Sequence, residues 1–120
     1  MSASGGWNLL AQIARLDCVN AHRVWAEVDL DAVTRNLAVI RRRAGPQTRI
    51  MFVVKADAYG HGAVALAHHA LRCGVGALGV GSSAEALELR ASGVRAPILV
   101  LGTLIDDEMD ECLRNDVHMA

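Results

Sequence analysis

From Val24 onward, short apolar runs alternate with segments whose apolar residues recur at helical spacing. The apolar runs predict strands at 24–29, 50–54, 77–81 and 98–101, with a further strand beginning at Val117. The helical pattern predicts helices between them, at 30–44, 63–73, 82–93 and 106–114. Strands that alternate with helices of about ten residues favour right-handed crossovers and a parallel sheet. The predicted fold class is therefore α/β.

Length and composition narrow the class of protein. The 120 residues suffice for one ordinary domain, 52% of them are apolar, and the net charge is −1. These values predict a globular cytoplasmic protein. With 3% aromatic residues and no basic stripe, a nucleic-acid partner is not expected. No run reaches the roughly twenty apolar residues of a membrane span.

Neither the cysteines nor residues 1–23 indicate a functional site. Cys18, Cys73 and Cys112 are far apart and odd in number, which fits a reducing compartment and neither a disulfide framework nor a metal site. Residues 1–23 precede the alternating pattern and are expected to be a flexible N-terminal extension. They have no basic start before an apolar run, so a signal peptide is not expected.

Lys55 is the only lysine, and it ends the apolar run that begins at Ile50. A lysine at the end of a buried strand can lose its hydration and attack an aldehyde as a nucleophile. Gly60 and Gly62 follow it, and glycines allow a turn to approach a ligand closely before a helix begins. The pattern predicts a candidate pyridoxal-phosphate lysine. On position alone, a solvated strand end is the commoner alternative.

The segment Val53-Val-Lys-Ala-Asp-Ala-Tyr-Gly-His-Gly62 closely resembles the cofactor-lysine signature of the alanine racemases, which are pyridoxal-phosphate enzymes of the fold-type III barrel class. Trp25–Val33, Glu85–Arg90 and Ala96–Gly102 resemble further family segments in the same order, so the similarity spans about residues 24–120. It implies the first half of a pyridoxal-phosphate-binding (β/α)8 TIM barrel, which needs roughly 250 residues when complete. The strand pattern alone fits a doubly wound sheet equally well.

The resemblance also implies site roles. Lys55 would hold pyridoxal 5'-phosphate as an internal aldimine and move the substrate's α-proton on one face. Tyr59 would contact the cofactor phosphate. Val53 and Leu101 would line the cofactor ring, although plain core positions are an equal alternative for both. The family's second base is a tyrosine from a second domain, contributed across a dimer interface, and residues 1–120 do not include it.

Other polar residues have structural interpretations. His61 is expected to satisfy nearby backbone groups, Asp57 to accept a hydrogen bond in the turn, and Ser82–Glu85 to form a capping box. The adjacent His68-His69 pair should point to different helix faces, so no metal site is predicted. Arg41-Arg42-Arg43 should interact with its own helix dipole and with solvent.

The resulting hypothesis is the amino-terminal part of an alanine racemase, an isomerase that interconverts L- and D-alanine and supplies D-alanine for cell-wall peptidoglycan. The full-length protein is expected to be a homodimer with an amino-acid substrate. Residues 1–120 by themselves are expected to be inactive. Two alternatives stay open: a racemase for another amino acid, such as serine, and a non-catalytic truncated barrel protein.

Overall fold

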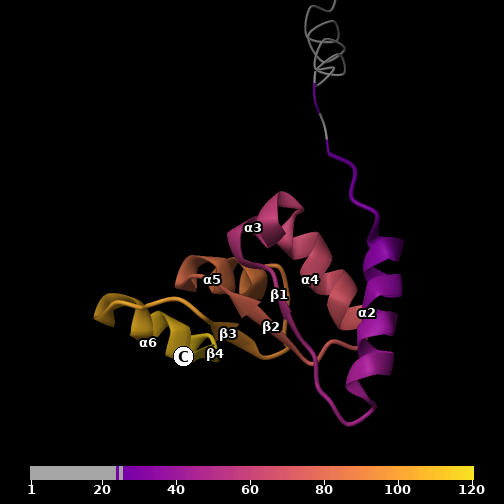
Figure 1. Ribbon diagram of the computed structural model, residues 1–120. Coiled ribbons are helices and arrows are strands. Elements are labelled where there is room, and N and C mark those ends of the chain that lie inside the picture. Colours follow the sequence, from indigo (N-terminus) through magenta and orange to yellow (C-terminus); the bar gives the residue numbers. More distant parts are fainter. Residues whose placement is uncertain (1–23, 25) are drawn as a thin grey trace, which may run out of the picture.

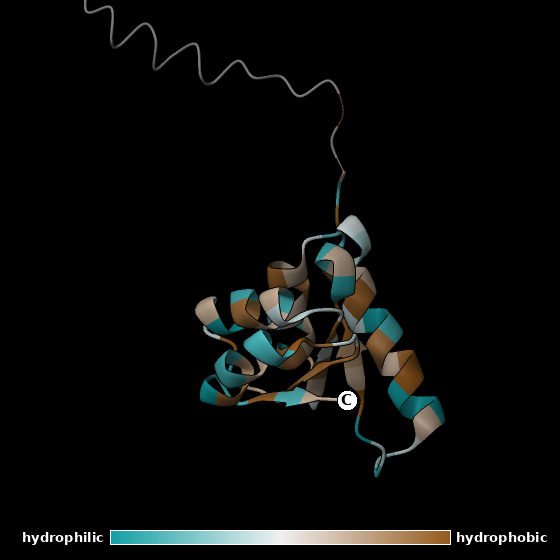
Figure 2. Ribbon diagram, turned by 90° about the vertical axis from the view of Figure 1, so that its left-hand side faces the viewer, coloured by the Kyte–Doolittle hydropathy of each residue, from teal (hydrophilic) through white to brown (hydrophobic). Residues whose placement is uncertain are grey.

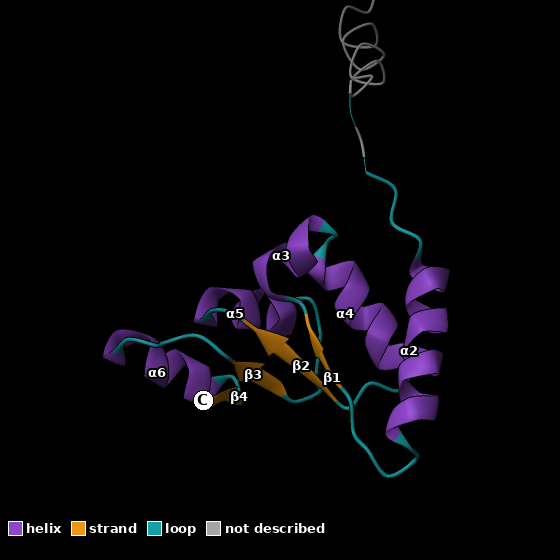
Figure 3. Cartoon of the chain, in the orientation of Figure 1, coloured by secondary structure: helices purple, strands orange, loops and turns teal. Residues whose placement is uncertain are grey.

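The computed structural model describes residue 24 and residues 26–120. This part of the chain contains one parallel sheet in the order β1-β2-β3-β4, formed by β1 (Met51–Val53), β2 (Ala77–Val80), β3 (Ile98–Val100) and β4 (Val117–Met119). The helical segments are α2 (Leu30–Ala44), α3 (Lys55–Gly60), α4 (Ala63–Arg72), α5 (Ser83–Ala91) and α6 (Asp106–Arg114) (Figures 1 and 3). The predicted α/β class is confirmed.

The strand order decides between the two architectures that the sequence pattern allows. In the register of the sheet, Phe52 lies beside Leu78, and Leu78 lies beside Ile98. Each new strand is added on the same side of the preceding one, and all pairs are parallel. A doubly wound sheet reverses its strand order at a switch point, whereas consecutive units of a (β/α)8 barrel do not. The described residues therefore form consecutive barrel units.

One face of this sheet is buried beneath the helices. Leu78, Ile98 and Val100 are completely buried, and they belong to the same hydrophobic cluster as Leu89 of α5 and Cys112 of α6. The strands are mostly hydrophobic, whereas the helices mix hydrophobic and hydrophilic residues (Figure 2). Amphipathic helices of this kind bury an apolar stripe against the sheet and leave the other side to solvent.

The other face of the sheet is open. Met51 is 41% exposed and Leu101, just after β3, is 45% exposed. A hollow of about 560 Å³ lies on this face, against Met51, Ala77, Leu99 and His118. Within the described residues, the run 50–54 is therefore covered on one side only.

Helix α2 is tied to α4 through Arg41. Its guanidinium donates hydrogen bonds to the carbonyl oxygens of Cys73 (3.1 Å) and Gly74 (3.0 Å), directly after α4. Carbonyl groups at a helix end have no intrahelical donor, so a neighbouring arginine can satisfy them. Arg41 is exposed in the last turn of α2, as expected, and in addition it binds the end of α4.

The expected strand at 24–29 is wrong for its described residues. No strand is present at residue 24 or at 26–29, and Val24 is 85% exposed. At the end of this segment, the Asp29 carboxylate accepts hydrogen bonds from the backbone N–H groups of Asp31 (2.9 Å) and Ala32 (3.1 Å). The hydrogen bond from Ala32, followed by the one from Arg35, holds the pKa of Asp29 below its ordinary 3.8. The segment caps α2 and pairs with none of the described strands.

The expected extension at 1–23, together with Trp25 and Cys18, lies outside the described residues. Within the part of the chain that the structure describes, every helix is too short or too polar to span a bilayer.

Candidate functional site

Lys55 lies where the sequence pattern places it, at the carboxyl end of β1. The backbone N–H of the preceding residue, Val54, donates to the carbonyl of Gly79 (2.8 Å), which carries the pairing one residue beyond the strand. Val54 is completely buried, but the side chain of Lys55 is exposed. The expected loss of hydration at Lys55 is therefore not seen in this part of the chain, because the neighbouring face of the sheet is open.

The backbone after Lys55 winds in the left-handed sense. Ala56, Asp57, Ala58 and Tyr59 all have φ between 51° and 58°, so α3 is a left-handed turn in place of an ordinary α-helix. For L-residues other than glycine, this conformation costs roughly 1–2 kcal/mol per residue. Such a turn persists only where other contacts hold it. The glycines of the motif predicted a turn here, but nothing in the sequence indicated its handedness.

Two predicted contacts hold the end of this turn. The Asp57 carboxylate accepts a hydrogen bond from the backbone N–H of Ala63 (2.7 Å), at the first residue of α4. The His61 ring nitrogen Nδ1 lies 2.9 Å from the carbonyl oxygen of Ala58. The structural roles expected for Asp57 and His61 are confirmed. Tyr59 is 63% exposed, so its side chain is accessible, four residues after the lysine in the chain.

Glycines shape the space around Lys55. A β-carbon on Gly81, directly after β2, would lie 3.4 Å from the β-carbon of Lys55. A β-carbon on Gly79 would approach Val53 and Leu101 to 3.2 Å each. Val53 and Leu101 therefore converge over a strand position without a side chain, on the open face of the sheet. The carboxyl edge thus combines an accessible amine with a small apolar surface.

The predicted capping box is only half formed. The Ser82 hydroxyl accepts a hydrogen bond from the backbone N–H of Glu85 (3.3 Å), as expected. The Glu85 carboxylate instead accepts from Gly81 (2.7 Å) and from Ala56 (2.8 Å). The contact with Ala56 joins two successive β/α units, and sequence reasoning missed it because the residues are far apart in the chain.

A sequence model described as "Alanine racemase, N-terminal domain" matches residues 28–120, most of the chain.

The chain belongs to the alanine racemase family.

Curated alanine racemases resemble this family member over a limited part of their length. The alanine racemase of Methanococcus maripaludis is 44% identical over 100 residues, which are 83% of this chain and 27% of the relative. Alanine racemase 2 of Bacillus subtilis is 53% identical over 79 residues, 66% of this chain and 20% of the relative. The chain thus spans about a quarter of the length of these relatives.

Solved alanine racemases have the same fold over this part. The enzyme of Clostridium difficile 630 matches with a TM-score of 0.78 and 39% identity, covering 82% of this chain and 27% of the other. The Bacillus anthracis enzyme with bound L-Ala-P matches with a TM-score of 0.78 and 42% identity, covering 80% and 25%. The expected first half of an alanine racemase barrel is confirmed.

The two adjacent histidines of this alanine racemase family member serve different helix contacts. His68 Nε2 lies 3.1 Å from the carbonyl oxygen of Ser92, after α5, whereas His69 Nε2 lies 2.7 Å from the hydroxyl of Thr34 in α2. The prediction that they point to different faces is confirmed. Among the described residues, no group of three His, Cys, Asp or Glu side chains is placed to hold a metal ion.

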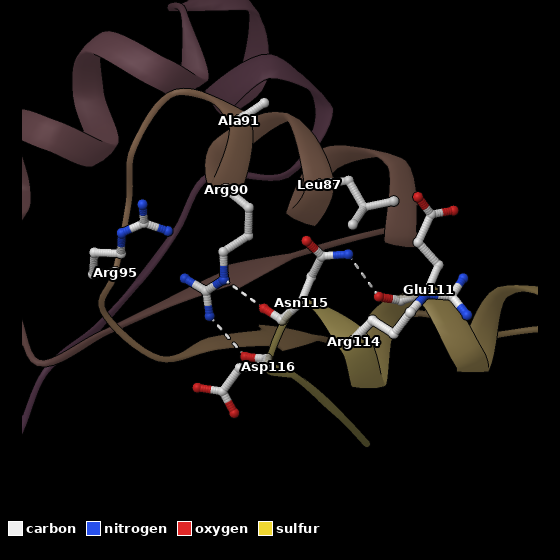
Figure 4. A pocket seen from close by; sticks show the side chains of 8 residues that line it. All are labelled: Leu87, Arg90, Ala91, Arg95, Glu111, Arg114, Asn115 and Asp116. Carbon is white, nitrogen blue, oxygen red and sulfur yellow. Dashed lines mark hydrogen bonds between the residues drawn. The ribbon is translucent and has the colours of Figure 1, made fainter.

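A second hollow lies away from this candidate site, between α5 and the end of α6, with a volume of about 580 Å³ (Figure 4). Arg90 reaches across it and donates to the carbonyl oxygens of Asn115 (2.9 Å) and Asp116 (2.7 Å). These residues directly precede β4, so the hollow lies at the amino end of the strand, whereas Lys55 follows a carboxyl end. Arg90 serves here to connect two successive helix ends.

Proposed function

We propose that this chain is the amino-terminal, pyridoxal-phosphate-binding barrel part of an alanine racemase, with residues 24–120 forming the barrel units and Lys55 as its catalytic lysine. The observation that carries the proposal is the position of the only lysine. It stands accessible at the carboxyl end of β1, beside Gly81, where parallel β/α folds place their sites. Membership of the alanine racemase family supports the same reaction.

The residues at this edge fit pyridoxal 5'-phosphate. Lys55 would hold the cofactor through its primary amine, a group that reacts readily with aldehydes. Tyr59, exposed and four residues further on, offers a hydroxyl donor to a phosphate. Val53 and Leu101 offer apolar contacts for a flat ring over Gly79. When bound, the cofactor supplies the electron sink for the carbanion at the substrate's α-carbon.

In this proposal, the chain's own residues hold the cofactor and move one proton. The left-handed turn and the end of β2 set the origin of the Lys55 side chain, whose amine takes or returns the α-proton on one face. Racemisation also needs an acid/base on the opposite face. Tyr59, the only tyrosine of residues 1–120, is assigned to the phosphate. The second base is therefore proposed to come from a further domain in a homodimer.

The substrate is proposed to be alanine, with D-alanine supplied for peptidoglycan in the cytoplasm, and with no nucleic-acid or membrane partner. Solved relatives carry small amino-acid analogues: one Clostridium difficile structure is a complex with cycloserine, and the Bacillus anthracis structure contains L-Ala-P. Those ligands belong to the relatives, and they support an amino-acid substrate here.

Reductive trapping tests the assignment of Lys55. The 120-residue chain is incubated with pyridoxal phosphate, reduced with borohydride and mapped by mass spectrometry. We expect the pyridoxyl group on Lys55 at cofactor concentrations about tenfold below those that label the α-amine of Met1. Lys55→Arg should lose this label, because arginine stays protonated. Labelling of Lys55 that only equals labelling of Met1 would refute the assignment.

A further inference from the structure

Glu85 makes a contact that neither helix capping nor the assigned site explains. It lies in the first turn of α5, and both of its carboxylate oxygens accept backbone hydrogen bonds. Oε1 accepts from Ala56 at 2.8 Å, and Oε2 accepts from Gly81 at 2.7 Å. Ala56 directly follows Lys55, and Gly81 directly follows β2. One side chain thus connects the backbone beside the lysine to the end of the neighbouring strand.

A helix cap alone does not account for this geometry. In a capping box, the glutamate accepts from the backbone N–H of the N-cap residue, which here is Ser82. A carboxylate in the first turn is also favoured by the helix dipole. Neither effect requires the Glu85 side chain to reach Ala56 in the preceding β/α unit. One carboxylate oxygen of Glu85 nevertheless accepts a hydrogen bond from Ala56.

Ala56 is also the residue at which the left-handed turn, with its unfavourable backbone conformation, begins. It is the first of the left-handed residues, with φ of 51°. The far end of the turn is held by Asp57, which accepts from Ala63, and by His61, which contacts Ala58. Those contacts are local to the turn and its following helix. The bond from Ala56 to Glu85 instead fixes the beginning of the turn to α5.

The same carboxylate and the stem of the lysine both approach the position where Gly81 lacks a side chain. The position that a β-carbon would occupy on Gly81 is 3.4 Å from Lys55 Cβ and 3.4 Å from Glu85 Oε2. The absence of a side chain at Gly81 therefore lets both groups lie against the end of β2. A change at Glu85 should move the point from which the lysine side chain starts, because Lys55 and Ala56 share a peptide bond.

We propose that Glu85 is a positioning residue for Lys55. Its carboxylate holds the beginning of the left-handed turn against the end of β2 and so fixes the direction of the lysine amine. This inference rests on the proposed function of Lys55, and it assigns Glu85 no contact with substrate or cofactor.

The test compares Glu85→Ala and Glu85→Gln with Glu88→Ala, an exposed glutamate on the same helix. Three quantities are measured on the 120-residue chain: amide hydrogen exchange at Ala56 and Gly81, urea unfolding, and the pyridoxal phosphate concentration that half-labels Lys55 relative to Met1. Amide exchange reports the hydrogen bonds from Ala56 and Gly81 to Glu85 without any cofactor. The second separates a local change from a general loss of stability.

For Glu85→Ala, we expect amide exchange at Ala56 to become about tenfold faster, beyond any change in the exchange of core amides. The pyridoxal phosphate concentration that half-labels Lys55 should rise by a similar factor. Glu85→Gln should recover part of both effects, because its amide oxygen still accepts one bond. Glu88→Ala should match the unchanged chain. Unaltered labelling in Glu85→Ala, or exchange that rises equally throughout the core, would overturn the proposal.

The same measurements distinguish a failure of the function proposed for Lys55 from a failure of the role proposed for Glu85. If the unchanged chain shows no preference for Lys55 over Met1, the assignment of Lys55 fails. Exchange at Ala56 then still decides whether Glu85 holds the turn, since that measurement involves no cofactor.

Discussion

Gly102 and Gly81 meet backbone to backbone at the carboxyl ends of β3 and β2. A β-carbon on Gly102 would overlap the carbonyl oxygen of Gly81. Because the obstacle is main chain, no rotation of a side chain can relieve it. The spacing of the two loops beside Lys55 therefore depends on the absence of a side chain at position 102.

The first prediction is that Gly102→Ala destabilises the chain by about 1–3 kcal/mol, as overpacking in a tight contact does. Gly76→Ala is the matched control. Its added β-carbon would meet its nearest neighbours at 3.7 Å, which is ordinary contact distance. Urea unfolding of both variants measures the difference. Equal unfolding free energies for the two variants would contradict the backbone contact.

The second prediction concerns the left-handed turn. Ala56→Gly should leave the stability unchanged or raise it by up to about 1 kcal/mol, because glycine adopts positive φ without steric cost. Ala65→Gly, at an exposed position within α4, should lower the stability by about 1 kcal/mol. Urea unfolding again gives both values. An Ala56→Gly variant as unstable as Ala65→Gly would mean that the turn is not left-handed in solution.

The third prediction separates binding from proton transfer. Tyr59→Phe should weaken retention of pyridoxal phosphate by about 1–3 kcal/mol, the usual range for a hydrogen bond to a charged group. Stability should change little, because the side chain is 63% exposed. Cofactor titration followed by absorbance measures the loss in a longer protein that carries this segment. Retained cofactor affinity with proton exchange lost on one face only would make Tyr59 the second base instead.

The fourth prediction follows from the buried thiol. Cys112 is completely buried, and this burial raises the pKa of its thiol above the ordinary 9.0, with the charges of Glu108 and Glu111 adding to the shift. Above pH 9.0 the unfolded chain loses this proton more readily than the folded chain. The stability contribution is therefore present below pH 9.0 and is lost as the pH rises beyond it.

Urea unfolding at pH values on either side of 9.0 measures this effect, with Cys112→Ala as the comparison. The variant should be less stable at neutral pH, because it leaves a small cavity, but it should lose less stability as the pH rises. The same decline in both proteins would show that other groups cause it.

The fifth prediction concerns residues 1–120 expressed by themselves. They should show no measurable racemisation with excess pyridoxal phosphate, because catalysis needs two bases and a complete cofactor site in one geometry. Exchange of the alanine α-proton with solvent, followed by NMR together with chiral product analysis, measures this. Formation of D-alanine that disappears in Lys55→Ala would refute the prediction.

Much of the fold follows from short-range patterns in the sequence. The alternation of apolar runs and helical spacing places the described strands β1 to β4 and the boundaries of α2, α4 and α6 closely. These elements share a simple physical cause, since each buries a continuous apolar run or stripe. The segment 24–29 has the same composition as a strand, but in the described residues it has no neighbouring strand with which to pair.

The site was only partly predictable. The position of Lys55 follows from the strand that precedes it, and the local contacts of Asp57 and His61 follow from common turn chemistry. The left-handed backbone does not, because residues 56–59 contain no glycine and local preference favours a right-handed helix. Its cause is tertiary, and contacts such as that of Ala56 with Glu85 have no signature in a single sequence.

The order of the sheet also bears on how the chain acquires its structure during synthesis. Met51 pairs with Ala77, Leu78 with Ile98, and Ile98 with Val117, so each strand joins the one made just before it. Closing such loops takes little chain entropy compared with pairing distant segments. No described strand therefore has to wait for a partner that is made much later in the chain.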